Sequence, residues 1–204
     1  MMSKTHISVG IAAALAAAPA TPEGLVYALM GGALGSVVCD IDRNAEQPSR
    51  DAKQGWGVAG TIFFAAFMHE SMAYWQNFRL SYLLGDPKTL VCLLFLAAIL
   101  LFAANGAHRG FSHSLRMFLS TSFFLFILSR KTCLFYGIAF LTHLVLDVMN
   151  KRPLKLLFPL SKGFCLRWCY CDGLVNRILM WAGTAAAAGL LIAKFGVNNL
   201  NLFR

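Results

Sequence analysis

Residues 88–104, KTLVCLLFLAAILLFAA, contain no charged side chain after Lys88. A helix of this length rises about 25 Å, which approaches the roughly 30 Å thickness of the hydrocarbon core of a bilayer. A second apolar run, residues 111–129, FSHSLRMFLSTSFFLFILS, follows after a short polar turn. Strands are excluded because an open sheet cannot satisfy its edges in lipid. The two runs therefore predict neighbouring transmembrane helices.

Five further apolar runs extend this pattern over the rest of the chain. They cover residues 6–19, 24–39, 57–75, 132–149 and 178–195. The first two and 132–149 are shorter, richer in small residues or interrupted by polar ones, so we expect them to be buried among the others. Gly31, Gly32 and Gly35 give one run a small face where another helix can approach closely. The sequence predicts an all-α, polytopic membrane helix bundle of about five to seven transmembrane or membrane-buried helices, in one domain over residues 1–204.

The composition agrees with a chain embedded in lipid. Hydrophobic residues make up 58% of the 204 residues and charged residues only 13%, against about 25% charged in a soluble domain. The formal net charge of +9 comes from basic residues that lie mostly in the predicted loops. Orientation in the membrane and attraction to anionic headgroups account for this charge, so membrane lipids rather than nucleic acid are the expected partners. The sequence leaves the oligomeric state open.

The first 20 residues imitate a secretory signal, with Lys4, an Ala-rich run and then Ala18-Pro19-Ala20. Another apolar run begins a few residues later, at Leu25, so an uncleaved first helix is the preferred reading. The cluster Cys165, Cys169, Cys171 lacks the paired C-x2-C spacing of zinc ribbons, and we expect these thiols to be reduced and structural.

The order of the apolar runs predicts where their polar ends meet. We call the membrane face that holds the N-terminus side A, and the opposite face side B. If all seven runs cross the bilayer, every second connection returns to side A. Four separate pieces of sequence then bring metal-competent residues to side A: His6; Asp40 and Asp42; residues 105–110; and His143 with Asp147.

The distribution of basic residues predicts which compartment side A faces. Side A holds twelve of the 18 basic residues: Lys4, Arg43, Arg50, Lys53, Arg109, Arg116, Lys151, Arg152, Lys155, Lys162, Arg167 and Arg177. Cytoplasmic loops carry an excess of Lys and Arg, so side A is predicted to be cytoplasmic.

The most specific motif is residues 108–114, HRGFSHS. Its two histidines, His108 and His113, flank a glycine-bearing turn into an apolar helix, whose N-cap we expect near Ser112. Neutral imidazoles bind zinc, and Arg109 between them could hold a phosphate oxygen bidentately. The alternative is a polar turn at the membrane interface.

Two further pairs supply carboxylates. Asp40 and Asp42 follow an apolar helix and could converge on one or two cations, or form a solvated helix end. His143 and Asp147 are four residues apart and share a helix face. Either both bind metal, or the aspartate orients the imidazole, or the pair makes an interhelical hydrogen bond.

On these residues the chain resembles the YdjM-type (LexA-regulated) inner-membrane proteins, a family described as membrane-bound metal-dependent hydrolases. The resemblance runs from His6 to about Pro159 and includes the Asp40-Ile41-Asp42 motif, the 108–114 motif, and His143 and Asp147 followed by LLFP at 156–159. It implies a multi-pass protein of the bacterial inner membrane with hydrolase activity, and leaves the substrate open. The family often has histidine where Arg43 stands, and usually Thr and Gly where Asn150 and Pro153 stand.

The expected activity is hydrolysis of a phosphoester, in a lipid-like or otherwise phosphorylated substrate, with a metal-activated water. Zinc is the expected metal, with manganese or iron as alternatives. The predicted metal ligands are His6, Asp40, Asp42, His108, His113, His143 and Asp147, and the predicted catalytic residues are Asp42, Arg109 and His113. Asp40 and Asp42 would bridge a second ion or accept the proton of the water, and Arg109 would stabilise the phosphate.

The rival prediction is a non-enzymatic metal transporter or metal-stabilised scaffold. A transporter should hold its ligands near the bilayer midplane on broken helices, whereas this sequence puts them at helix ends. A basic loop with interleaved aromatic residues, predicted over 151–177, could lie on the bilayer surface and guide an anionic headgroup, or be an ordinary cytoplasmic loop. The P-S-G-H motif of membrane acid phosphatases is absent from the sequence, as is the D-G-x2-A-R run of CDP-alcohol phosphotransferases.

Overall fold

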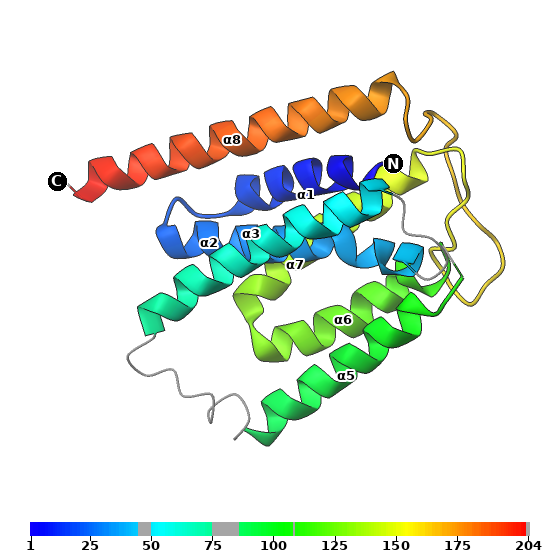
Figure 1. Ribbon diagram of the computed structural model, residues 1–204, viewed down its shortest axis with the longest axis horizontal. Coiled ribbons are helices and arrows are strands. Elements are labelled where there is room, and N and C mark those ends of the chain that lie inside the picture. Colours follow the sequence, from blue (N-terminus) through cyan, green and yellow to red (C-terminus); the bar gives the residue numbers. More distant parts are fainter. Residues whose placement is uncertain (45–49, 75–85, 108, 203–204) are drawn as a thin grey trace.

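The protein is described by a computed structural model that covers residues 1–44, 50–74, 86–107 and 109–202 (Figure 1). Within these ranges the chain forms seven α-helices and two 3-10 helices. They are α1 (Ser3–Ala17), α2 (Pro22–Val37), η1 (Val38–Asn44), α3 (Arg50–Tyr74), α5 (Pro87–Ala104), η2 (Phe111–His113), α6 (Leu115–Leu128), α7 (Arg130–Val148) and α8 (Leu174–Leu202). The seven α-helices correspond to the seven apolar runs, so the predicted all-α bundle is confirmed.

The helices run back and forth along one axis. In Figure 1 the N-terminus, η1, η2 and the C-terminal end of α7 all lie at the right-hand end of the bundle. The segments that the alternation of crossings assigned to side A therefore meet at one end of the molecule.

Within the described ranges, four stretches are long and apolar enough to span a membrane: Pro22–Asp42, Pro87–Ala104, Arg130–Val148 and Leu174–Gly196. α6 is apolar but shorter, at 14 residues. Within an apolar segment of 18 residues from each stretch, 78% of the residues are buried in Pro22–Asp42 and 50% in Arg130–Val148. The corresponding shares are only 11% in Pro87–Ala104 and 6% in Leu174–Gly196. The glycine-rich α2 and the polar-bearing α7 thus form the interior as predicted, and α5 and α8 form the outside.

Glycines on α2 allow its neighbours to pack backbone to backbone. A Cβ atom at Gly31 would lie 2.6 Å from the carbonyl oxygen of Thr132 on α7, closer than real Cβ atoms approach. A Cβ atom at Gly35 would lie 2.9 Å from the amide nitrogen of Phe140. Gly32 faces Ala14 on α1. The small face predicted from sequence is therefore the contact surface that holds α2 against α7 and α1.

The start of α6 differs from the prediction. Its N-cap is Ser114, whose hydroxyl accepts a hydrogen bond from the amide of Met117, rather than Ser112. Residues 111–113 first form the short turn η2, closed by a 3.0 Å bond from the amide of Ser114 to the carbonyl of Phe111. This turn frees the hydroxyl of Ser112 to donate to Asp42 instead.

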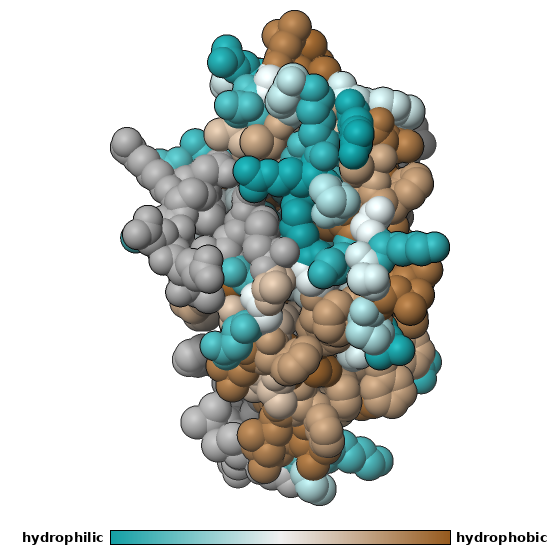
Figure 2. All heavy atoms as spheres, turned by 90° about the vertical axis from the view of Figure 1, so that its right-hand side faces the viewer, coloured by the Kyte–Doolittle hydropathy of each residue, from teal (hydrophilic) through white to brown (hydrophobic). Residues whose placement is uncertain are grey.

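The basic aromatic loop ends at Gly173 rather than Arg177, because α8 begins at Leu174. Within the loop, Leu154 and Phe164 exchange two backbone hydrogen bonds of 2.9 Å, and Leu154 is fully buried. Trp168 and Tyr170 are exposed. Figure 2 looks onto this end of the molecule and shows hydrophilic side chains across its upper and middle part, with hydrophobic ones below.

Candidate metal centre

Four chain segments bring predicted site residues together at the end of the bundle. α1 contributes His6, η1 contributes Asp40 and Asp42, the turn before α6 contributes Arg109 and His113, and α7 contributes His143 and Asp147. All seven are buried, and the most accessible of them, Arg109, is only 8% exposed. The eighth predicted residue, His108, lies outside the described residues.

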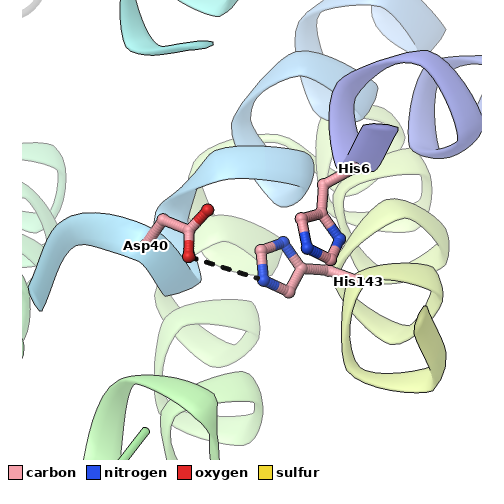
Figure 3. A group of neighbouring side chains, drawn as sticks. All are labelled: His6, Asp40 and His143. Atoms are coloured by element: carbon pink, nitrogen blue, oxygen red, sulfur yellow. Dashed lines mark ion pairs between the residues drawn. The ribbon is translucent and has the colours of Figure 1, made fainter. Parts of the chain in front are cut away.

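Among the side chains that the structure describes, two overlapping groups could hold a metal ion. One is His6, Asp40 and His143, and the other is His113, His143 and Asp147; within each group the potential ligand atoms lie within 4.8 Å of one another. Figure 3 shows the first group, in which the rings of His6 and His143 stack face to face and Asp40 approaches from the end of the second helix. The ring centroids are 3.7 Å apart and the planes are inclined by 11°.

Four atoms at the centre of the two groups have the spacing of a ligand shell. His113 Nε2 lies 3.6 Å from Asp40 Oδ1 and 3.4 Å from Asp147 Oδ2. His143 Nε2 lies 4.0 Å from each of the same oxygens. A zinc ion with bonds of about 2.0–2.1 Å at tetrahedral angles separates its ligands by about 3.4 Å. These four separations equal that value or exceed it by up to about 0.6 Å.

The hydrogen bond on the far side of the His143 ring determines its tautomer. Nδ1 lies 2.7 Å from the carbonyl oxygen of Ser36, and a carbonyl can only accept, so Nδ1 carries the proton. Nε2 makes no hydrogen bond, although it is buried. In the neutral ring Nε2 therefore carries a lone pair, and it lies 4.0 Å from an oxygen of each of two carboxylates. Such an arrangement is repulsive by itself and favourable once a cation lies between them.

Asp42 supports His113 from behind. Its Oδ2 accepts hydrogen bonds from the hydroxyl of Ser112 and from the amide of Arg109, the latter at 3.1 Å, and lies 3.4 Å from Nδ1 of His113. The opposite ring nitrogen, Nε2, faces Asp40 and Asp147. Asp42 was predicted as a ligand, but the structure places it in neither potential metal group, on the side of the ring where it can orient the imidazole.

The carboxylates make the centre electronegative. Burial lowers the pKa of His113, but the nearby Asp40, Asp42 and Asp147 outweigh it and raise the pKa to about 9. Surroundings that favour the charged imidazole also favour other cations at the same place.

Arg109 lies at the edge of the centre and contacts Asp147 and the backbone of Arg152. Its guanidinium places Nη2 3.0 Å from Asp147 Oδ2 and donates through Nη1 to the carbonyl of Arg152 at 2.5 Å. Its φ of 63° lies in the left-handed region, which costs a non-glycine residue about 1 kcal/mol or more and is concentrated at functional sites. Asp147 is also bound by the α-amino group of Met1 at 2.6 Å and lies 3.3 Å from His6 Nε2.

Sequence reasoning missed three serines that complete the centre. Ser3 donates a 3.0 Å hydrogen bond to Asp40 Oδ2, Ser36 supplies the carbonyl for His143, and Ser112 binds Asp42. Ser112 lies inside the 108–114 motif, and its position next to His113 was a usable signal. Ser36 acts through its backbone and Ser3 through a partner 37 residues away, so neither role leaves a pattern in the sequence.

The sequence model of one protein family, described as YdjM inner membrane protein, matches residues 1–201 of the chain. The matched range includes every residue of the centre. No curated protein and no solved structure matches the chain.

Proposed function

Because the chain belongs to the YdjM inner membrane protein family, we propose that it is a membrane-bound, metal-dependent hydrolase that cleaves a phosphoester of a lipid-like substrate. The observation that carries the proposal is the orientation of His143. Its ring donates to Ser36 and turns a bare nitrogen toward two buried carboxylates, an arrangement that suits a metal ligand and no ordinary hydrogen bond.

Four residues would hold the metal: Asp40, His113, His143 and Asp147. His6, stacked on His143, belongs to the overlapping group and would complete it or serve a second ion. The mixed imidazole and carboxylate set suits zinc, with manganese and iron as alternatives. A bound divalent cation would lower the pKa of a water molecule toward 7 and neutralise charge on a phosphate.

Other residues of the chain would orient the metal-binding histidines and bind the phosphate. Asp42 fixes the ring of His113, and the carbonyl of Ser36 fixes that of His143, as partners of metal-binding histidines commonly do. Arg109 lies at the edge of the centre with its planar guanidinium against Asp147. A phosphate oxygen could share this guanidinium, because its forked donors match a phosphate bidentately.

We further propose that the centre faces the cytoplasm. Support comes from the excess of basic residues, twelve of 18, on the membrane face to which the order of the apolar runs assigns the centre. The exposed aromatic and basic side chains of the adjoining loop suit the headgroup layer on that side.

Phosphate release from lipid substrates tests the hydrolase proposal. The purified protein, reconstituted in vesicles, is offered phosphatidic acid and, separately, a prenyl monophosphate, with and without EDTA. We expect release that EDTA abolishes and that His113→Ala eliminates. His69→Ala changes a histidine outside the predicted centre and should retain activity. Equal turnover in His113→Ala, or in the chelated protein, contradicts the proposal.

The burial of the centre favours a second candidate, a metal that only holds the bundle together. All of its described side chains are at most 8% exposed, and they join four segments distant in sequence. A purely structural metal predicts that chelation lowers the midpoint of thermal unfolding while no substrate is hydrolysed. Such a scaffold would also tolerate loss of the Arg109 guanidinium, which a phosphoesterase would not.

A further inference from the structure

A groove of about 770 Å³ lies on the bundle away from the metal centre. Helices α1, α2, α3 and α8 line it, and its walls are almost entirely apolar. Characteristic lining residues are Ile7, Ile11, Val58, Ile62, Trp181 and Leu191. In Figure 1, α8 runs alongside α1. A groove of this character in a membrane protein is suited to a hydrocarbon chain.

Two basic side chains lie at the side-A end of the groove. Lys4 is one of its lining residues and is exposed. Arg177 is also exposed and precedes Trp181 by four residues, so it projects from the same face of α8, one turn closer to side A. No Asp or Glu is among the described residues that line the groove. The charge at its mouth is therefore complementary to an anion.

The length of the groove matches one leaflet of a bilayer. Along α8 its lining residues extend from Met180 to Leu191, which at 1.5 Å per residue is about 16 Å. Half of a hydrocarbon core of roughly 30 Å is about 15 Å. The groove is thus long enough to hold the part of one hydrocarbon chain that a single leaflet accommodates.

We propose that this groove binds one hydrocarbon chain of an anionic phospholipid, with the headgroup phosphate against Lys4 and Arg177. The lipid site is separate from the metal centre. Lys4, Ile7 and Ile11 share one face of α1, whereas His6 projects from the opposite face. Binding of the lipid therefore does not depend on the proposed metal or on hydrolysis.

Native mass spectrometry of the detergent-purified protein tests the proposal. The protein is equilibrated with equal amounts of phosphatidylglycerol and phosphatidylcholine that carry the same acyl chains. We expect retention of one phosphatidylglycerol per chain. The double variant Lys4→Gln, Arg177→Gln should lose this preference, by about fivefold for each charge. The exposed loop pair Lys155→Gln, Lys162→Gln is the matched control and should keep it.

A second pair of variants tests the chain-binding part of the groove. Ala188→Trp fills the groove, whereas Ala186→Trp places the same bulk on the opposite, exposed face of α8. Lipid should be lost from Ala188→Trp and retained by Ala186→Trp, with the metal content of both unchanged. Equal retention of the two lipids by the wild type, or retention in Ala188→Trp, overturns the proposal. A lipid-free dimer would overturn it as well and assign the groove to a second copy. If Ala188→Trp does not fold, the exposed charge variants decide.

Discussion

Two histidine rings at the centre are fixed by different acceptors on their far sides. The carbonyl of Ser36 holds His143, and the carboxylate of Asp42 faces His113 together with the hydroxyl of Ser112. In both rings Nε2 is left facing Asp40 and Asp147. The chemistry of the centre therefore depends on residues that would not themselves touch the ion.

Replacing Asp42 tests this dependence. Asp42→Asn preserves the shape of the side chain but removes the charge that holds Ser112 and His113. We expect metal affinity to fall by about 10- to 100-fold, the usual effect of losing such a partner, while the bundle remains folded. Equilibrium dialysis with zinc measures the change, and Asp172→Asn in the exposed loop is the control. An affinity equal to that of the wild type would remove Asp42 from the centre.

Replacing Arg109 separates catalysis from metal binding. Arg109→Lys keeps the positive charge and the same conformational cost of the left-handed φ of 63°, because lysine also carries a Cβ atom. It removes the planar guanidinium and its paired N–H donors. We expect phosphate release to fall by about 100-fold or more, and the metal content to stay at the wild-type level. Unchanged kcat/KM on the lipid phosphates would show that the guanidinium does not contact substrate.

At the scale of the elements, the contact between α2 and α7 leaves no room for a side chain at Gly31 or Gly35. Gly35→Ala would push a methyl group against the backbone of α7 near Tyr136 and Phe140, and we expect it to destabilise the fold by about 1–3 kcal/mol. Gly60→Ala is the matched control on α3, where a Cβ atom would meet nothing within 4 Å. It should be neutral or stabilise by up to about 1 kcal/mol. Unfolding in detergent measures both, and equal effects would contradict the close contact.

The helices could be predicted from sequence because the apolar runs have no other way to satisfy their backbone in lipid. The ends of the helices were less predictable. Ser112 and Ser114 are both good N-caps by residue type, and the choice between them depended on the distant carboxylate of Asp42, which binds Ser112. Similarly, α8 begins three residues before Arg177, because charged residues can lie in a helix end at the membrane surface.

At the scale of the whole molecule, alternation of the crossings explains why a dispersed set of residues forms one centre. His6, Asp40, His143 and Asp147 were assigned to one face from the order of the runs alone, and the structure brings them together there with His113. The individual contacts could not be predicted. The ion pair of Arg109 with Asp147 joins residues whose approach depends on the packing of whole helices.

The same alternation makes a prediction about orientation. Cys171 is exposed in the loop beside the centre. If side A is cytoplasmic, a membrane-impermeant maleimide should not label Cys171 in intact spheroplasts and should label it after permeabilisation. The measurement uses a Cys133→Ser background, because Cys133 is the partly exposed thiol near the other end of the bundle. Labelling in intact cells would place the centre on the opposite side.

The central claim is that the buried histidines and aspartates hold a metal ion. Metal analysis by mass spectrometry of the detergent-purified protein tests it most directly, with the wild type beside His143→Ala and His69→Ala. We predict stoichiometric zinc, manganese or iron in the wild type and in His69→Ala, and its loss in His143→Ala. Absence of stoichiometric metal from the wild type, even after reconstitution with these ions, or its retention in His143→Ala, would contradict the account.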